Sequence, residues 1–285
     1  MIAAMTRRLQ AAQPQRPVRG LTRFAALLDR VLPRYQGVIR LPEGAYLQVD
    51  SREPAQRWLL YSGSYQPAVT HALRQHTPRG GWCLDVGANL GYYTITLAAW
   101  AGSEGRVAAF EANPAMAAQV RANVQLNATR DDFAPVDVVA QPVHHCAGPV
   151  TFYVSDSPGK SSVVAGHVRA PVEQLTLEAI TIDSYLTAQG WPRLDIIKID
   201  IEGNDCNALL SAETSLSRFR PVIVFEYNFK TPQTVAADTF ALLARLGYAC
   251  QTLERNGRRS TFDWQRSAEQ AGTSHVDVIA LPDGS

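Results

Sequence analysis

The sequence predicts an α/β fold built on a doubly wound, mostly parallel sheet. From Gly80 onward, apolar strand-like segments alternate with helix-compatible segments, an order typical of a parallel sheet with helices on both faces. A glycine-punctuated turn follows the first of these strands, and acidic residues end or follow several others. The chain has 285 residues, enough for one sizeable α/β domain with an appendage.

The composition narrows the class of protein. Apolar residues at 46% and charged residues at 19% are those of an ordinary soluble globular protein. A net charge of +1 gives no general attraction for nucleic acid, so we expect no nucleic-acid partner. No apolar run approaches the ~20 residues of a membrane helix. The first residues lack the apolar core of a signal peptide. The four cysteines lack C-x-x-C spacing. We therefore expect a cytoplasmic protein with reduced thiols and no transmembrane segment; its oligomeric state is not indicated.

The chain divides into three predicted parts: a flexible basic tail (1–20), a small N-terminal cap of helix and strands (21–78) and the main domain (79–285). Helical spacing of apolar residues predicts an amphipathic helix over 21–32 in the cap. Two strands, 38–41 and 45–49, flank a turn with proline and glycine. We expect this cap to shape the substrate side of the site.

Regular elements follow one another through the main domain. Helices are predicted after Gly91, from Pro114 towards Asn127, and over 234–246, because proline suits a first helical turn and glycine, here Gly247, often follows a helix end. Apolar or alternating runs predict strands at 82–86, 106–110, 136–140, 150–154, 195–201, 222–225, 248–253 and 275–281.

The turn Asp85-Val86-Gly87-Ala88-Asn89-Leu90-Gly91 is the most informative motif. A dinucleotide fingerprint needs a second glycine where this chain has Asn89, because the pyrophosphate occupies that space. The spacing D-x-G-x-x-x-G suits S-adenosylmethionine, which has no phosphate and carries an ammonium group that Asp85 can anchor directly or through water. The next strand ends on Glu111, a position from which a carboxylate accepts hydrogen bonds from ribose hydroxyls.

These positions predict an S-adenosylmethionine site in a Rossmann-like sheet. The alternative is an ordinary strand-to-helix turn, which the acid at the end of the second strand disfavours. Asn113 is expected to cap the following helix and can also reach the ribose. The predicted cofactor-binding residues are Asp85, Gly87, Ala88, Asn89, Gly91, Glu111 and Asn113.

Acidic residues at later strand ends predict the catalytic group. Side-chain alternation along 195–201 predicts that Lys198, Asp200 and Glu202 share one face. Three ionisable groups on one face of a covered strand are costly unless they are paired or functional. Lys198 could simply pair with an acid. We predict Asp200 as the catalytic residue, with Glu226 on the adjacent strand as its partner and Glu202 as a further candidate.

The chain resembles the FkbM family of class I S-adenosylmethionine-dependent methyltransferases over roughly residues 60–230. The resemblance is carried by Asp85-Val86-Gly87-Ala88-Asn89-Leu90-Gly91-Tyr92-Tyr93-Thr94, Phe110-Glu111-Ala112-Asn113-Pro114, Ile197-Lys198-Ile199-Asp200-Ile201-Glu202-Gly203 and Arg220-Pro221-Val222-Ile223-Val224-Phe225-Glu226. It implies O-methylation of a hydroxyl on a sugar, glycolipid or secondary metabolite, and a last strand inserted antiparallel. Gln66 and Pro142 depart from the family, which usually has an acid and an alanine there.

The implied reaction is an in-line displacement that needs alignment of oxygen, methyl and sulfur and removal of the hydroxyl proton. Asp200 is the preferred base. Alternatively, Asp200 and Glu226 hold Mg²⁺, which would lower the pKa of the hydroxyl; the sequence does not choose. The partner is expected to be a small-molecule or glycan hydroxyl.

Other side chains are weaker candidates. His144 and His145 follow the third strand, His167 lies beside a Ser/Gly-rich loop (155–166) that can close over substrate, and His275 begins a strand. For each histidine a structural or surface role is favoured. Aromatic rings can line the substrate mouth or simply pack in the core: Tyr61, Tyr65, Tyr92 and Tyr93.

Three other functions were weighed. A nicotinamide-dependent oxidoreductase is disfavoured by Asn89 and by the lack of a Tyr-x-x-x-Lys constellation after the fourth strand. An enzyme that methylates amino groups of DNA or RNA bases would carry an Asn/Asp-Pro-Pro-aromatic motif where Asp200-Ile201-Glu202-Gly203 stands. A non-catalytic S-adenosylmethionine-binding partner subunit is disfavoured only by the acids at the fourth and fifth strands.

Overall fold

The computed structural model describes residues 35–53, 56–57, 59–60, 63–254, 257–265 and 272–284. The predicted tail (1–20) and the predicted cap helix (21–32) lie outside the described residues, as does Tyr61. None of the described helices is long and apolar enough to cross a membrane.

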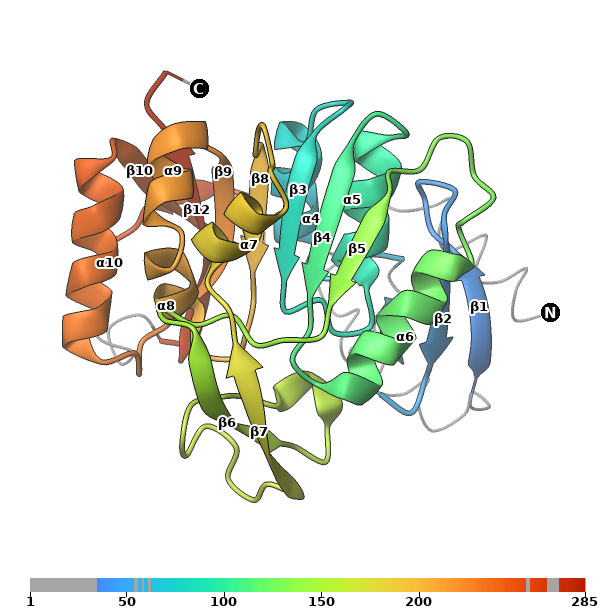
Figure 1. Ribbon diagram of the computed structural model, residues 1–285, viewed down its shortest axis with the longest axis horizontal. Coiled ribbons are helices and arrows are strands. Elements are labelled where there is room, and N and C mark those ends of the chain that lie inside the picture. Colours follow the sequence, from blue (N-terminus) through green and yellow to red (C-terminus); the bar gives the residue numbers. More distant parts are fainter. Residues whose placement is uncertain are drawn as a thin grey trace.

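The core of the molecule is an eight-stranded sheet in the order β11-β10-β12-β9-β8-β3-β4-β5. Figure 1 labels its strands from β10 to β5. The run from β9 to β5 is parallel, whereas β12 pairs antiparallel with both β9 and β10. The mostly parallel fold and the antiparallel last strand are confirmed. The strands are β3 (Trp82–Val86), β4 (Arg106–Phe110), β5 (Val136–Val139), β8 (Ile196–Ile199), β9 (Val222–Asn228), β10 (Tyr248–Leu253), β11 (Arg259–Thr261) and β12 (His275–Pro282).

Helices cover both faces of this sheet, because its strands are apolar on both sides. Leu84 and Ile197 face one core, whereas Cys83 and Ile196 face the other. The first core is covered by α7 (Ile182–Ala188), α8 (Asp205–Leu210), α9 (Glu213–Phe219) and α10 (Gln233–Arg245). The second is covered by α4 (Pro67–His76) and α5 (Tyr92–Ala101), while α6 (Pro114–Gln125) packs beside β5.

Helix α5 is buried along its whole length. It has the sheet on one side, and β1 (Gln36–Arg40) and β2 (Tyr46–Asp50) form an antiparallel hairpin that adds Leu47 and Val49 to the same core. Asn127 and Asn123 accept hydrogen bonds from the amides of Tyr46 and Gln48, both at 2.8 Å. A helix enclosed in this way has to be apolar all round, as its sequence is. The two strands predicted for the cap are confirmed.

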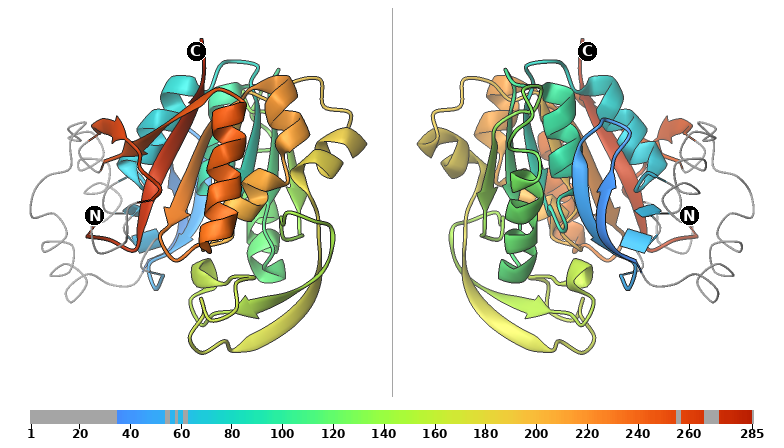
Figure 2. Two further views of the ribbon diagram at one scale, coloured as in Figure 1. Left: turned by 90° about the vertical axis from the view of Figure 1, so that its left-hand side faces the viewer. Right: turned by 90° about the vertical axis from the view of Figure 1, so that its right-hand side faces the viewer.

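A second hairpin projects from the edge where the parallel strands end (Figures 1 and 2). Its first strand, β6 (Gly148–Val154), contains the predicted extended segment, and its second, β7 (Glu173–Ala179), pairs with it antiparallel. The sequence analysis did not predict β7, although Leu175 and Leu177 alternate there with polar residues. Between the strands lie the Ser/Gly-rich loop and a short 3-10 turn, η1 (Pro158–Lys160).

The strand predicted over 195–201 is shorter than expected. Strand β8 ends at Ile199, and the backbone then turns, with φ of 54° at Glu202. The prediction that Lys198, Asp200 and Glu202 share one strand face is therefore wrong, because side-chain alternation ends with the strand.

Candidate active site

A pocket opens where β3, β4 and β8 end, at the edge from which the β6–β7 hairpin projects. Its wall includes the turn 87–90 after β3, Phe110 and Glu111 at the end of β4, and residues 141–143 after β5. Residues 200–202 after β8 and residues 161–163 of the hairpin loop complete it. Distant parts of the chain therefore meet at one edge, as expected for a ligand site in an open α/β sheet.

Close contact with the neighbouring strand shapes the glycine turn. Gly87 has φ of 83°, and a Cβ built on it would lie 1.9 Å from the carbonyl oxygen of Asp200, so no larger residue fits. The amides of Gly87 and Ala88 both donate to the carbonyl of Phe110 at 2.9 Å, which ties the turn to β4. Asn89 has φ of 52° and Gly91 has φ of 93°, after which α5 begins.

Glu111 joins this turn to helix α6. Its Oε2 accepts from the amide of Asn89 at 2.7 Å, and its Oε1 accepts from the amide of Asn113 at 2.8 Å. Burial raises the pKa of Glu111 to about 6, although the two amides lower it. Asn113 caps α6 as predicted, because its Oδ1 accepts from the amide of Ala115 at 3.0 Å. Each carboxylate oxygen keeps a lone pair with which it can accept a ligand hydroxyl.

Asp85 lies beneath the turn, not on the pocket wall. Its carboxylate is 0% exposed and accepts from the hydroxyl of Thr94 at 2.6 Å. The Nζ of Lys198 lies 3.2 Å from its Oδ1 and donates to the carbonyl of Gly87 at 3.0 Å. Burial lowers the pKa of Lys198, but Asp85 and Asp200 more than offset this and raise it. The pairing of Lys198 with an acid is thus observed, and this pair supports the turn from below.

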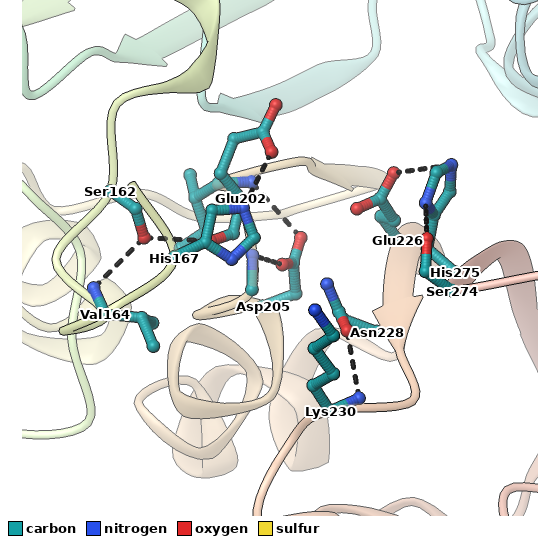
Figure 3. Close-up of polar contacts among 12 residues, drawn as sticks. Ser162, Val164, His167, Glu202, Asp205, Glu226, Asn228, Lys230, Ser274 and His275 are labelled. Atoms are coloured by element: carbon teal, nitrogen blue, oxygen red, sulfur yellow. Dashed lines mark hydrogen bonds and ion pairs between the residues drawn. The ribbon is translucent and has the colours of Figure 1, made fainter. Parts of the chain in front are cut away.

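Figure 3 shows three acids beyond the end of β8, Glu202, Asp205 and Glu226. Asp200 lines the pocket, and its side chain makes no hydrogen bond or ion pair with any other residue in the described part of the chain. Asp205, which the sequence analysis missed, opens α8 and accepts from the amides of Ile201 and Gly203, both at 3.2 Å. Burial and, next, Asp200 raise the pKa of Asp205 to about 7. An acid in the first turn of a helix is the signal that could have found it, but the sequence analysis predicted no helix at 205–210.

Glu226 is the acid whose pKa departs furthest from its usual range. Its side chain on β9 is 12% exposed, and its Oε2 lies 3.6 Å from the Nε2 of His275. Burial, which has the largest effect, and the neighbouring acids Asp200, Asp205 and Glu202 together raise the pKa of Glu226 to about 9. The pKa of Glu226 is therefore raised above its usual range, and Asp200 is the neighbouring acid that contributes most to the rise after burial.

Glu202 is engaged by the hairpin loop. Its Oε2 lies 3.1 Å from the Nε2 of His167, and its carbonyl oxygen accepts from the hydroxyl of Ser162 at 2.8 Å (Figure 3). The same loop packs so closely on the glycine turn that a Cβ on Gly159 would lie 2.6 Å from the Nδ2 of Asn89. The loop therefore touches both the turn after β3 and the turn after β8.

Some of the aromatic residues predicted at the substrate mouth line the pocket, and the predicted histidines after β5 do not. Tyr65, Tyr92 and Tyr93 all line the pocket, but the hydroxyl of Tyr93 is occupied, donating to the carbonyl of Tyr65 at 3.1 Å. Burial and then Asp200 raise the pKa of Tyr65, so its ring lies near the acids. His144 and His145 do not line the pocket. Phe152 and Asn204 line it and were not predicted, because their positions depend on the β6–β7 hairpin and on the turn after β8.

The donor set near Asp200 does not fit the Mg²⁺ alternative well. Such an ion needs several oxygen ligands at close range. In the part of the chain that the structure describes, the one group of three or more His, Cys, Asp or Glu side chains with ligand atoms all within 4.8 Å of one another is His144, His145 and Cys146. Asp200 and Glu226 belong to no such group, and Asp205 is held by backbone amides.

Comparisons with solved structures return methyltransferases. Methyltransferase FkbM from Methylobacillus flagellatus KT has 13% identity and a TM-score of 0.44, over 80% of this chain and 54% of that chain. An O-methyltransferase from Bacillus cereus in complex with SAH has 18% identity and a TM-score of 0.40, over 74% and 77%. A TehB-like SAM-dependent methyltransferase from Corynebacterium glutamicum has 14% identity and a TM-score of 0.43, over 82% and 98%. The curated proteins contain no match to this sequence.

The family comparison is more specific. The methyltransferase FkbM domain matches residues 85–250, which is more than half of the chain. The match begins at the glycine turn and runs through Glu111, Asp200 and Glu226, so it contains all the acids discussed above. The chain therefore belongs to the FkbM family of S-adenosylmethionine-dependent methyltransferases.

Proposed function

We propose that this protein transfers the methyl group of S-adenosylmethionine to a hydroxyl of a sugar, glycolipid or secondary metabolite. The observation that carries the proposal is one pocket with two chemically different sides. We call the glycine turn 87–91 with Glu111 the cofactor side, and Asp200 and Glu202, which line the pocket, the acceptor side. Glu226 does not line the pocket, and we include it on the acceptor side because Asp200 and Glu202 act on its charge. A methyl donor and an acceptor must be held next to each other in this way for in-line transfer.

On the cofactor side, Glu111 would accept hydrogen bonds from the ribose hydroxyls while Asn89 and Asn113 hold its carboxylate. Gly87, Ala88 and Gly91 would let the turn approach the ligand closely. Asp85 would act through Lys198 and Thr94 by keeping the turn in place, since it lies off the pocket wall. S-adenosylmethionine supplies a methyl group on a sulfonium leaving group, so the protein mainly has to align the acceptor.

On the acceptor side, Asp200 would take the proton of the attacking hydroxyl. It lines the pocket and has no hydrogen-bonding partner among the described residues, so its oxygens are available. Glu226, protonated because its pKa is about 9, would add no second negative charge beside Asp200 and could donate a hydrogen bond. Glu202 would act through His167 by holding the hairpin loop over the acceptor. This division of roles does not require Mg²⁺.

The acceptor would be a small molecule or glycan, and we retain the expectation that nucleic acid is not the substrate. Tyr65, within the predicted cap, lines the pocket near the acids and would contact the acceptor face. Aromatic rings suit the apolar faces of sugars. A cytoplasmic location remains part of this proposal.

An acceptor screen tests the function. The purified protein is incubated with S-adenosylmethionine and hexoses, glycolipids, hydroxylated polyketides or bulk RNA, and S-adenosylhomocysteine release and methylated product are measured. We expect a methyl ether on one class of hydroxyl compound, with a rate that chelation leaves unchanged. Methylated RNA would contradict the acceptor assignment, and a rate that chelation abolishes would restore the Mg²⁺ alternative.

A ligand screen separates the competing functions. Thermal stabilisation by S-adenosylhomocysteine and not by NAD(H) is expected, and the reverse would favour the oxidoreductase. Binding of S-adenosylhomocysteine without turnover of any acceptor would favour the non-catalytic partner subunit.

A further inference from the structure

The loop after β5 places three metal-binding side chains in succession. His144, His145 and Cys146 each offer a ligand atom, and these atoms all lie within 4.8 Å of one another. The two imidazole rings lie side by side, with centroids 4.3 Å apart. The Sγ of Cys146 is 3.9 Å from the Nδ1 of His144. None of these side chains lines the pocket of the proposed methyl transfer.

The spacing of one pair, Cys146 and His144, is close to that of ligands already on a metal. Typical zinc bonds of about 2.3 Å to sulfur and about 2.0–2.1 Å to nitrogen, at a tetrahedral angle, separate the sulfur and nitrogen atoms by about 3.6 Å. The observed 3.9 Å between Cys146 and His144 needs an adjustment of only a few tenths of an ångström. Rotation of the exposed Cys146 side chain can supply it.

The backbone that carries the group is fixed on its N-terminal side. The amide of His144 donates to the carbonyl of Ile180 at 3.1 Å, and the amide of Ile180 donates to Pro142 at 2.9 Å. The side chain of Asn204 also donates to the carbonyl of Val143 at 3.0 Å. A ligand set on anchored backbone loses little freedom when an ion binds, which favours affinity.

The protein supplies three ligands and leaves the remaining positions to water or an external ligand. His145 borders a surface hollow that also contains Asp183 and Glu213. Asp183 already accepts from the amides of Thr214 and Ser215 at 2.9 and 2.8 Å, and Glu213 pairs with Arg245 at 2.7 Å. Both carboxylates are thus occupied. Two imidazoles and a thiolate suit Zn²⁺ and related borderline ions, whereas Mg²⁺ prefers oxygen.

We propose that His144, His145 and Cys146 form a surface site for a zinc-class divalent ion with an open coordination position. The site is distinct from the proposed acceptor side, and its occupancy can be measured without any methyl-transfer assay.

Cobalt(II) titration of the full chain, without a polyhistidine tag, tests this site. We expect one Co²⁺ per chain, a thiolate-to-cobalt charge-transfer absorption, and displacement of that absorption by Zn²⁺. Cys146→Ser should abolish the absorption, and His144→Gln and His145→Gln should each weaken binding by about 10-fold or more. Zn²⁺ should raise the Tm of the wild type but not of Cys146→Ser, because only the folded site binds it.

Matched controls sharpen the result. Cys250→Ser and His71→Gln remove the same side-chain types elsewhere and should leave the absorption and the affinity unchanged. Absence of the charge-transfer absorption in the wild type, or its persistence in Cys146→Ser, would overturn the proposal. Loss of the absorption in Cys250→Ser would also overturn the proposal, because the thiolate ligand would then be Cys250 and not Cys146.

Discussion

On the cofactor side of the pocket, Glu111 is held by the amides of Asn89 and Asn113, and the turn is tied to β4 through Phe110. On the acceptor side, Asp200 has no such partner among the described residues, and burial together with the neighbouring acids raises the pKa of Glu226 to about 9. Like charges kept close together are costly to folding and mark places where a protein retains reactivity. Under the proposed function, the cofactor side is organised in advance, whereas the acceptor side is completed by its ligand.

The largest effect on turnover is expected when the charge of Asp200 is removed. Asp200→Asn keeps the size of the side chain but removes the base, so turnover of the acceptor should fall by ~10²–10⁴. Steady-state assays on the acceptor from the screen measure this, with Glu104→Gln, an exposed acid before β4, as the control. Unfolding of Asp200→Asn would contradict the comparison and leave Glu226 as the better catalytic candidate.

A change in the backbone of the cofactor side should destabilise the protein strongly. Gly87→Ala puts a Cβ 1.9 Å from the carbonyl of Asp200 at φ of 83°, so the free energy of unfolding should drop by ~3 kcal/mol or more. Urea denaturation measures it.

Gly257→Ala is the matched control for this prediction. Gly257 has φ of 82°, but a Cβ built on it meets no atom within 4 Å, so the variant isolates the cost of the backbone angle at about 1 kcal/mol. Equal losses in the two variants would mean that the contact between the turn and β8 is not tight.

The burial of Glu226 and the acids around it predict a pH dependence of stability. Its pKa of about 9 in the folded protein lies above the usual 4.5, so between these values the unfolded chain has lost the proton while the folded chain keeps it. Stability therefore falls as pH rises through this window, by at most about 1.4 kcal/mol per pH unit. Glu226→Gln lacks this fall and should exceed the wild type by about 1 kcal/mol or more at pH 8. Parallel stability curves from pH 5 to 9 would refute the raised pKa.

The smallest effect is expected at the loop that bridges the two sides. His167→Gln weakens the contact with Glu202, so the KM for the acceptor should rise about 2- to 10-fold, the worth of one net hydrogen bond, with kcat unchanged. His71→Gln on α4 is the control. A fall in kcat without a change in KM would instead give His167 a part in the chemistry.

The sequence predicted most of the sheet and the turn and helix cap at the ends of β3 and β4, because both depend on local signals. The glycine turn, Glu111 and the cap at Asn113 can each be recognised from a few neighbouring residues, and the fold around them is as expected. The place of Lys198 was harder to predict, since its pairing with Asp85 joins residues on different strands.

The residues after β8 were predicted less well, because their positions also depend on contacts between segments that are distant in the sequence. Glu202 follows a strand that ends earlier than its apolar pattern suggests, so the alternation argument failed there. The contact of Gly159 with Asn89 and that of His167 with Glu202 depend on how the β6–β7 hairpin packs over the sheet edge. No periodicity within a single segment encodes such contacts.

Calorimetric titration of S-adenosylhomocysteine into the wild type, Glu111→Ala and Asp200→Asn tests the central claim, that the pocket has separate cofactor and acceptor sides. We predict that Glu111→Ala weakens binding by roughly 1–3 kcal/mol, the cost of losing hydrogen bonds to a charged acceptor. Asp200→Asn should bind as the wild type does. Equal weakening in both variants, or unchanged affinity in Glu111→Ala, would contradict the division of the site.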